Sequence, residues 1–539
     1  MRDEEITIGM SDGVSVALRL YRPAGQGKFP VLFAASPYRF DNDDIPETNL
    51  FPWRETGPIA WYVEQGYAYA HLDVRGTGKS DGEYGFFDRR ERRDLYEVIE
   101  WLGEQPWSNG RVGGIGHSYY AASQWCMASE RPPSLACIAP YDGHMDFGGG
   151  WAYTGGIPCA FMSEWWNGNV RPINARPANG AAPRILELDL PHLVSMHPSG
   201  DAFWQERSIV ERLGQVTIPV YSIGVWSKLD LHLAGNIMGY ERVSGPKKLL
   251  LSGAPSMAAA QAEFESVDFH REILLPFYDR WLNGLPTGYE ARPAVQYFVK
   301  RSGVRRESDC WPPRESRRRT WHLSAAPSGS LISLNDGSLQ EDPPARKESC
   351  VKYSYPDPQW TLGPVCMTPE GPDPVRRVLT FTTAPMQQEL TLAGSGELVL
   401  YLQCSREDTD VVVKLSEQLP QDAAERSAGR QPKFIPITKG WLRASHRQEG
   451  FERRTGDPVR LRADPLPLEA GRIYELRVPL MATAHRIAPG SRLRIEIANG
   501  DSPITDHVFA HIYTPDKVGT DTIHHSAAYP SRLLFEAID

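Results

Sequence analysis

The sequence lacks several features that mark particular classes of protein. It has no run of about 18 uninterrupted apolar residues, so we expect no transmembrane helix and no membrane partner. The acidic N-terminus, MRDEEITIGMSDG, has no apolar core, so we expect no signal peptide. The formal net charge of −9 leaves no basic excess for a phosphate backbone. We therefore expect no nucleic-acid partner.

Paired cysteines and cofactor motifs are also absent. The seven cysteines are scattered, with no CxxC motif and no zinc-type spacing. Such a set is typical of free thiols in a reducing compartment, so we predict a cytoplasmic protein. The sequence has neither a phosphate-binding glycine loop nor a dinucleotide fingerprint, and we predict no cofactor and no metal. We expect the partner to be a small-molecule substrate.

The pattern of apolar and polar residues changes along the 539 residues of the sequence. In residues 1–144, and again in 218–300, short apolar runs alternate with helical patterns, which favours a mostly parallel sheet with helices on its faces. Residues 145–217 are rich in aromatic residues and glycine, with short helical stretches, and predict a helical insertion. From residue 301 onwards, short alternating strands are separated by turn signals. This pattern of short strands and turns predicts an all-β sandwich or jelly roll.

The most informative segment is RVGGIGHSYYAASQW, in which an apolar strand, a glycine turn and a helical pattern follow one another. A serine on a tight turn between a strand and a helix is the nucleophile-elbow arrangement, which exposes the hydroxyl. Ser118 is at this position, and the N–H of Tyr119 would point to a developing oxyanion. The second glycine of the usual motif is Tyr120 here. On this pentapeptide alone, a serine that merely caps the helix is an equally good interpretation.

Longer segments show a resemblance to a known family. They include FPVLFAASPYRF, GYAYAHLDVRGTGKSDGEY, EVIEWLGEQPWSNGRVGGIGHSYY and AHRIAPGSRLRIEIANGDSP. With these segments the chain resembles the CocE/NonD serine hydrolases, the family of cocaine esterase and of X-prolyl dipeptidyl aminopeptidase, nearly end to end. The resemblance implies an α/β-hydrolase domain (residues 1–144 and 218–300), a helical cap (145–217) and a C-terminal jelly roll (301–539).

The resemblance also implies site residues. Ser118 matches the family's nucleophile, and Tyr38 matches the tyrosine whose hydroxyl helps to stabilise the oxyanion. A tyrosine buried in the core is the alternative for Tyr38. The family's acid follows the strand that here is PVYSIGVW, but Ser227 stands at its position. Asp230, in the same loop, is our candidate acid, and an aspartate in a solvated loop or helix cap is an equally good interpretation.

The histidine of the family has no counterpart at its expected place. It lies in a loop that here is residues 254–263, where no histidine occurs and where Ser256 or Met257 takes its position. The next histidine along the chain is His270, which is our candidate base. A helix cap or a surface residue is the alternative for His270.

Two functional hypotheses follow. The first is an esterase or acylase that cleaves an ester or amide of a small molecule through an acyl-enzyme on Ser118. The second is a fold that has lost the hydrolytic triad and serves a cyclisation, elimination or decarboxylation in secondary metabolism, because oxyanion donors also stabilise such reactions. A binding or scaffolding protein built on the jelly roll is a third class. If the chain oligomerises, we expect a homodimer, the commonest soluble assembly.

Overall fold

The computed structural model describes residues 1–41, 55–176, 182–330, 333–360, 363–364, 367–368, 371–372, 377–428, 430–447, 461–502 and 515–538. It contains two compact units, and each is described by itself. The N-terminal unit comprises Met1–Gly150, Met162–His197 and Ala202–Tyr297. The C-terminal unit comprises Trp151–Phe161, Pro198–Asp201 and Phe298–Asp539.

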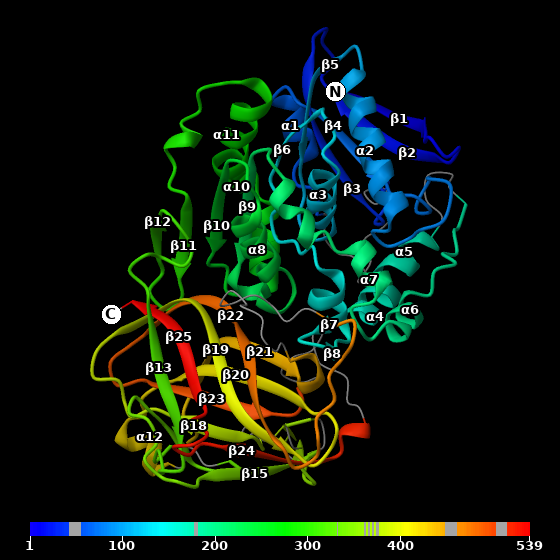
Figure 1. Cartoon of the computed structure of the whole chain (residues 1–539). Helices are drawn as coiled ribbons and strands as arrows, with labels where there is room; N and C mark the ends of the chain where they lie inside the picture. The colour runs from blue at the N-terminus through cyan, green and yellow to red at the C-terminus, as the bar shows by residue number, and fades with distance from the viewer. Residues whose placement is uncertain are drawn as a thin grey trace. The chain divides into compact units, whose positions relative to one another are not determined.

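The N-terminal unit is built on a mostly parallel sheet with the strand order β1-β2-β4-β3-β5-β6-β9-β10-β11 (Figure 1). The first two strands and the β2–β4 pair are antiparallel, and the pairs from β4 onwards are parallel. The strands are β1 (Arg2–Gly9), β2 (Ser15–Arg22), β3 (Phe29–Ser36), β4 (Ala68–Asp73), β5 (Ser108–Gly114), β6 (Leu135–Ile138), β9 (Val220–Val225), β10 (Lys247–Ser252) and β11 (Val295–Val299). This is the parallel α/β sheet that the apolar runs predict.

Helices alternate with these strands, as the 3.6-residue periodicity predicts. In α2, the buried residues Leu95, Val98, Ile99 and Leu102 lie on one face, and the Asp88 side chain caps the start by accepting from the Glu91 N–H. The helices are α1 (Ile59–Glu64), α2 (Arg89–Glu104), α3 (Tyr119–Glu130), α4 (Phe161–Trp165), α5 (Arg171–Asn174), α6 (Leu190–Met196), α7 (Ala202–Arg207), α8 (Ala234–Arg242), α9 (Met257–Glu265), α10 (Val267–Phe269) and α11 (Leu275–Tyr278).

Residues 145–217, the expected cap, do not form a unit of their own. The short helices α4 to α7 lie in this segment, as predicted, but it also contains a small hairpin of β7 (Tyr153–Thr154) and β8 (Ile157–Pro158). The hairpin belongs to the C-terminal unit, where the Arg443 N–H donates to the Gly155 carbonyl at 2.8 Å. Glycine is required there because a Cβ on Gly155 would lie 2.2 Å from the Trp441 carbonyl oxygen. Backbone pairing therefore divides the segment between the two units.

The C-terminal unit is the all-β domain that the short alternating strands predict. Its main sheet has the order β15-β24-β19-β22-β21-β20-β23-β18-β14-β13-β25, and β25 also pairs with β19, which closes the sheet on itself. Leucine, isoleucine and valine side chains fill its core. The strands are β13 (Arg317–Ser324), β14 (Gly337–Gln340), β15 (Cys350–Tyr355), β18 (Leu379–Thr382), β19 (Leu390–Cys404), β20 (Asp410–Gln418), β21 (Phe434–Arg443), β22 (Ile473–Ile487), β23 (Arg492–Ala498), β24 (Gly519–His524) and β25 (Arg532–Ile538). The unit also contains β12 (Val304–Ser308), β16 (Met367–Thr368), β17 (Gly371–Pro372) and α12 (Ala423–Ser427).

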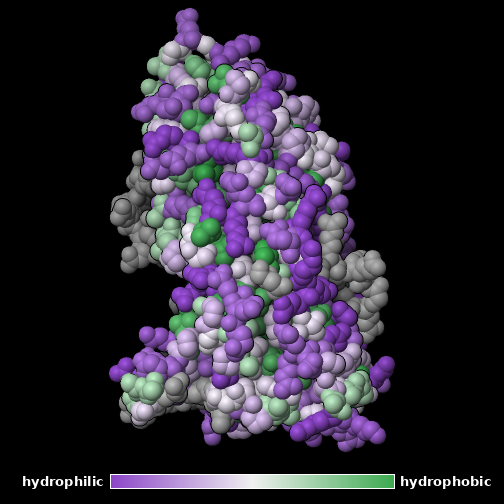
Figure 2. Space-filling view, turned by 90° about the vertical axis from the view of Figure 1, so that its left-hand side faces the viewer, coloured by the Kyte–Doolittle hydropathy of each residue, from purple (hydrophilic) through white to green (hydrophobic). Residues whose placement is uncertain are grey.

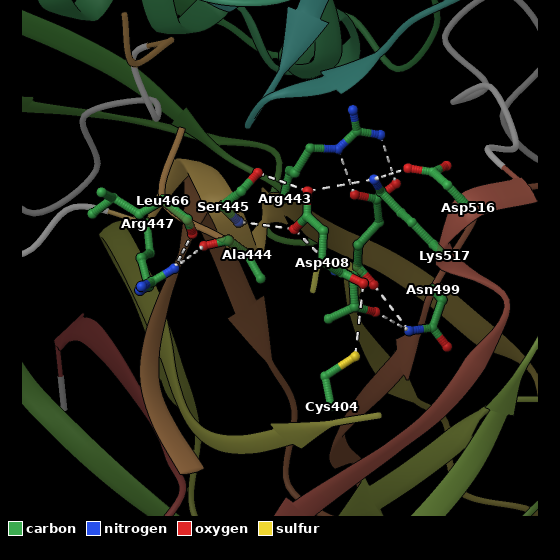
Figure 3. A network of polar contacts seen from close by, with 12 residues as sticks. Cys404, Asp408, Arg443, Ala444, Ser445, Arg447, Leu466, Asn499, Asp516 and Lys517 are labelled. Carbon is green, nitrogen blue, oxygen red and sulfur yellow. Dashed lines mark hydrogen bonds and ion pairs between the residues drawn. The ribbon is translucent and has the colours of Figure 1, made fainter. Parts of the chain in front are cut away.

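A network of charged side chains fixes the turns at one end of this sheet (Figure 3). The Asp410 carboxylate pairs with the Arg443 guanidinium at 2.8 Å. The Asp408 carboxylate accepts from the Ser445 hydroxyl at 2.7 Å and lies 3.4 Å from the Lys517 ammonium. Because each carboxylate faces cations or hydroxyl donors of the same unit, the network is structural.

The cysteines, the helices and the surface bear on whether the protein is disulfide-bonded, membrane-spanning or metal-binding. The six cysteines that the structure describes are free, and Cys366 lies outside the described residues. None of the described helices is long and apolar enough to cross a bilayer. Within the same residues, no group of three or more metal-ligating side chains comes together. On the face drawn in Figure 2, hydrophobic residues are scattered among hydrophilic ones.

Candidate active site

Ser118 lies in the turn between β5 and α3 in a strained conformation. Its φ is 58° and its ψ is −120°, a region that residues with a side chain rarely adopt. The side chain makes no capping hydrogen bond to α3, so the interpretation as a helix-capping serine is wrong. A strained serine between a parallel strand and a helix is the geometry of a nucleophile elbow.

The packing around the elbow explains why the second glycine of the motif is dispensable. Gly116 has a φ of 112°, and a Cβ there would lie 2.4 Å from the Tyr120 Cβ. A Cβ on Gly143 would lie 2.4 Å from the Ala121 Cβ. Glycine at position 116 thus leaves room for Tyr120, and glycine at position 143 leaves room for Ala121. The Tyr120 hydroxyl reaches the His71 Nε2 at 2.8 Å, which accommodates the larger side chain.

Two hydrogen-bond donors lie beside the Ser118 hydroxyl. Tyr38 follows β3, and its phenol contacts the Ser118 side chain while accepting from the Trp165 indole at 2.8 Å. Burial raises the pKa of Tyr38 well above its usual range, so the phenol keeps the proton that it would donate. Tyr119 is the first residue of α3, where backbone N–H groups have no partner within the helix. The structure thus brings Tyr38 and Tyr119 to Ser118, and their role as oxyanion donors stays a prediction.

The segment that carries Tyr38 is held by a buried carboxylate. Asp73, at the end of β4, accepts from the backbone N–H of Phe40 at 2.7 Å and from that of Lys79 at 2.9 Å. Burial raises the pKa of Asp73 to about 7. Because Phe40 is two residues from Tyr38, this bond fixes the path of the chain beside the site.

The position expected for the acid carries no carboxylate. Ser227 lies in the 3₁₀ turn Trp226–Lys228, and its buried hydroxyl has no hydrogen-bond partner among the described residues. Asp230 lies in the next turn, Leu229–Leu233, and is half-buried. Its catalytic role stays a prediction.

A buried ion pair lies at this edge of the sheet instead, and sequence reasoning missed it. Asp142 follows β6, and its carboxylate pairs with the ammonium of Lys228. Its carbonyl accepts from the Ser118 N–H at 2.8 Å, and its own N–H donates to Ile223 at 2.7 Å. Burial raises the pKa of Asp142, an effect that Lys228 partly offsets. The carboxyl ends of β5, β6 and β9 thus bring a serine, a carboxylate and a cation to one place.

His270 is neither a surface residue nor placed as a base for Ser118. It is fully buried, and its Nε2 lies 2.8 Å from the Phe264 carbonyl oxygen, so this nitrogen carries a proton. The other nitrogen, Nδ1, lies 2.9 Å from the Tyr62 hydroxyl. Burial lowers the pKa of His270 to about 4. Both nitrogens are therefore engaged in a neutral, structural imidazole.

The loop expected to carry the base is largely the helix α9. Ser256 begins it, accepting from the Ala259 N–H at 3.2 Å. On the inner face, Gln261 lies 3.2 Å from the Nε2 of His117, whose ring also packs beside Phe264. Burial lowers the pKa of His117 well below its usual range. From the segment in which the family resemblance implies a histidine, Gln261 on α9 thus contacts His117 of the elbow.

Glu55 is the second residue that sequence reasoning missed. It precedes α1, is 5% exposed, and faces the Ser118 side chain. Its backbone carbonyl accepts from the His117 N–H at 3.1 Å, which fixes it beside the elbow. Burial raises the pKa of Glu55 to about 8, although Lys228 and Ser118 lower it in part. No motif surrounds Glu55 in the sequence, so only the fold reveals it.

The parallel sheet, the strained serine and the C-terminal β domain together define an α/β-hydrolase with an added domain. Residues 12–254 match the model of the X-Pro dipeptidyl-peptidase (S15 family), and residues 287–534 match that of the X-Pro dipeptidyl-peptidase C-terminal non-catalytic domain. The chain belongs to the CocE/NonD family of hydrolases, as its sequence segments indicate.

Individual relatives span nearly the whole chain. Cocaine esterase from Rhodococcus sp. is 24% identical over 99% of this chain and 98% of its own length. A putative Xaa-Pro dipeptidyl-peptidase from Streptomyces avermitilis is 22% identical over 92% of this chain and 78% of its own. A solved CocE/NonD family hydrolase from Staphylococcus aureus has the same fold, with a TM-score of 0.80 at 23% identity, covering 99% of this chain and 93% of its own. By their names these relatives are hydrolases. They give no support to the alternative of a non-hydrolytic reaction.

Proposed function

We propose that this protein is a serine hydrolase that cleaves an ester or amide of a small molecule through an acyl-enzyme on Ser118. The observation that carries the proposal is the strained backbone of Ser118 at the end of a parallel strand. Its side chain makes no capping bond and contacts the Tyr38 phenol instead. Strain of this kind persists where the surrounding structure enforces it, commonly at active sites.

The proposed reaction uses the donors beside the serine. The Ser118 oxygen attacks the carbonyl carbon of the substrate, and the resulting oxyanion accepts from the Tyr38 hydroxyl and the Tyr119 N–H. Collapse of this intermediate expels the alcohol or amine and leaves the acyl group on Ser118. A water molecule then releases the acid and restores the serine.

Labelling with a fluorophosphonate probe tests the nucleophile. We expect the wild-type chain to be labelled and Ser118→Ala to be unlabelled, because the probe bonds only to an activated serine. Ser227→Ala is the matched control, since that hydroxyl also lies near the strand ends but has no partner among the described side chains. An unlabelled wild-type chain, or a labelled Ser118→Ala variant, would overturn the proposal.

A further inference from the structure

A serine hydroxyl is a weak nucleophile unless a neighbouring group takes its proton. The histidine that does so in the family has no counterpart in residues 254–263. His270 is engaged at both nitrogens, and His117 faces Gln261. The group that faces the Ser118 hydroxyl is instead the carboxyl of Glu55.

We propose that Glu55 is the catalytic base of this site and takes the Ser118 hydroxyl proton in place of a histidine. The inference rests on the proposed function, because it assigns a role in the same reaction. It places a serine–glutamate pair where relatives of this fold use a histidine.

The geometry positions the Glu55 carboxyl for this role. The hydrogen bond from the His117 N–H to the Glu55 carbonyl fixes Glu55 next to the elbow. The two segments approach so closely that a Cβ on Gly116 would lie 3.2 Å from the Glu55 carbonyl oxygen. The carboxyl contacts the Ser118 side chain, and its Oε2 is buried with no hydrogen-bond partner among the residues that the structure describes. An unsatisfied buried carboxylate oxygen is costly, and a bond to a serine proton would satisfy it.

The charges around Glu55 suit a base. Lys228 favours the ionised carboxylate, whereas Asp142 and Glu265 oppose it, and the phenols of Tyr38 and Tyr141 also interact with it electrostatically. With burial, these groups hold the pKa of Glu55 at about 8. A carboxylate with a pKa near the working pH takes a proton more readily than an ordinary one, and the nearby cation preserves an ionised fraction.

Lys228, the cation near Glu55, is a weaker candidate for the base than Glu55. The Lys228 ammonium is paired with the buried Asp142 carboxylate, and an ammonium has no lone pair to accept a proton. Lys228 therefore acts on Glu55 through its charge, as a positioning residue.

Each step balances with Glu55 as the only proton carrier. The serine proton moves to the carboxylate as the Ser118 oxygen bonds to the carbonyl carbon. When the intermediate collapses, the bond to the leaving alcohol or amine breaks and the proton moves from Glu55 to that group. In deacylation, Glu55 takes a proton from water, hydroxide bonds to the acyl carbon, and the proton returns to the departing Ser118 oxygen.

The test is the rate of p-nitrophenol release from p-nitrophenyl acetate, measured with the full chain before the steady state and across pH. In the wild type, we expect acylation to increase as the pH rises through about 8, where Glu55 ionises. Glu55→Gln should lower kcat by about 10²–10⁴-fold with a smaller effect on KM, and should lose this pH dependence. Glu55→Asp, which keeps the carboxyl at a shorter reach, should recover part of the rate and the pH dependence.

Two matched variants move the pH profile in opposite directions. Glu265 raises the Glu55 pKa, so Glu265→Gln should shift the rise to lower pH with an unchanged plateau. Lys228 lowers that pKa, so Lys228→Met should shift the rise to higher pH. Circular dichroism of each variant checks that it is folded, and the Glu265→Gln result stands if Lys228→Met fails to fold.

The outcomes separate this inference from the proposed function. A wild-type chain without Ser118-dependent labelling or turnover overturns the proposed function. Ser118-dependent turnover that Glu55→Gln leaves unchanged overturns the role of Glu55 alone. An increase in KM with kcat preserved also overturns it, because that result makes Glu55 an anchor for the substrate.

Discussion

Buried titratable side chains set the chemistry of the N-terminal unit at the scale of single residues. Tyr38 keeps its proton because burial raises its pKa, and Glu55 has a pKa of about 8 for the same reason. Lys228 and Asp142 share one buried ion pair. Burial therefore determines which of the groups beside Ser118 hold a proton.

Replacing Tyr38 by phenylalanine tests the oxyanion donor. We expect Tyr38→Phe to lower kcat for p-nitrophenyl acetate by about 10²–10³-fold, because one donor to the oxyanion is lost. Tyr84→Phe is the control, since that buried phenol bonds to the Tyr119 hydroxyl and should keep most of the activity. Equal rates in wild type and Tyr38→Phe would exclude the phenol from catalysis.

Glu91 makes the folding stability depend on pH. Burial raises its pKa from 4.5 to about 8, so between these pH values the folded chain holds a proton that the unfolded chain releases. Its contribution to the free energy of unfolding is therefore complete below about pH 4.5 and is lost as the pH rises through about 8. Glutamine mimics the protonated acid at this position.

Urea unfolding at pH 5 and pH 8 checks this dependence. We expect Glu91→Gln to lose less stability between the two pH values than the wild type, by at least about 1 kcal/mol, because each pKa unit is worth about 1.4 kcal/mol. Glu97→Gln is the control, because this half-buried carboxylate of the same helix has a lowered pKa. The Glu97→Gln variant should lose as much stability between pH 5 and pH 8 as the wild type does. Parallel curves for wild type and Glu91→Gln would contradict the argument.

At the scale of elements, periodicity predicts most of the N-terminal unit. The helical spacing of Leu95, Val98, Ile99 and Leu102 is found in α2 (Arg89–Glu104), and the segment PVYSIGVW contains β9 (Val220–Val225). The segment 254–263 is different, because a serine cap starts a helix there. Local patterns therefore reveal α2 and β9, whereas the loop that the resemblance implied over 254–263 is largely the helix α9.

The candidate site is only partly predictable from the sequence. Ser118 and Tyr38 lie in recognisable segments at strand ends. Asp142 also follows a strand, and the rule that parallel strand ends meet at one edge would have indicated it. Glu55 depends on how a loop returns to the elbow, and its pKa depends on burial and on Lys228. Such properties arise from the tertiary fold and have no local pattern.

The elbow depends on the absence of a side chain at Gly116. We expect Gly116→Ala to abolish labelling of Ser118 and to destabilise the chain by several times the cost of Gly110→Ala. Both glycines have positive φ, 112° and 84°, but only a Cβ at Gly116 meets another atom within 4 Å. The control should cost about 1–2 kcal/mol, the price of left-handed backbone alone. Equal melting temperatures of the two variants would contradict the role of crowding.

At the scale of the whole molecule, the C-terminal unit is not one continuous stretch of chain. It includes Trp151–Phe161 and Pro198–Asp201 from within the predicted cap. The Gly200 N–H donates to the Arg462 carbonyl at 2.8 Å. In the same way, the hairpin is joined to this unit by the bond from the Arg443 N–H to the Gly155 carbonyl. The homodimer expected from the sequence stays a prediction, which light scattering would test.

A fragment that starts at Phe298 should therefore be less stable than the same unit in the full chain. It lacks the hairpin that pairs with Arg443, so we expect a lower melting temperature, measured by circular dichroism. A peptide of Trp151–Phe161 added in trans should raise that temperature, and the same peptide with Gly155→Ala should not, because its Cβ would meet Trp441. A fragment as stable as the full chain would show that the inserted segments are dispensable.

This interleaving also imposes an order on synthesis. The hairpin around Gly155 leaves the ribosome about 290 residues before Arg443, its backbone partner, and at ~5–20 residues per second it waits on the order of tens of seconds. During that time the hairpin lacks the strand β21, to which Gly155 bonds in the folded unit. We therefore expect the C-terminal unit to be completed only after β21 has been synthesised, although part of that unit was made about 290 residues earlier.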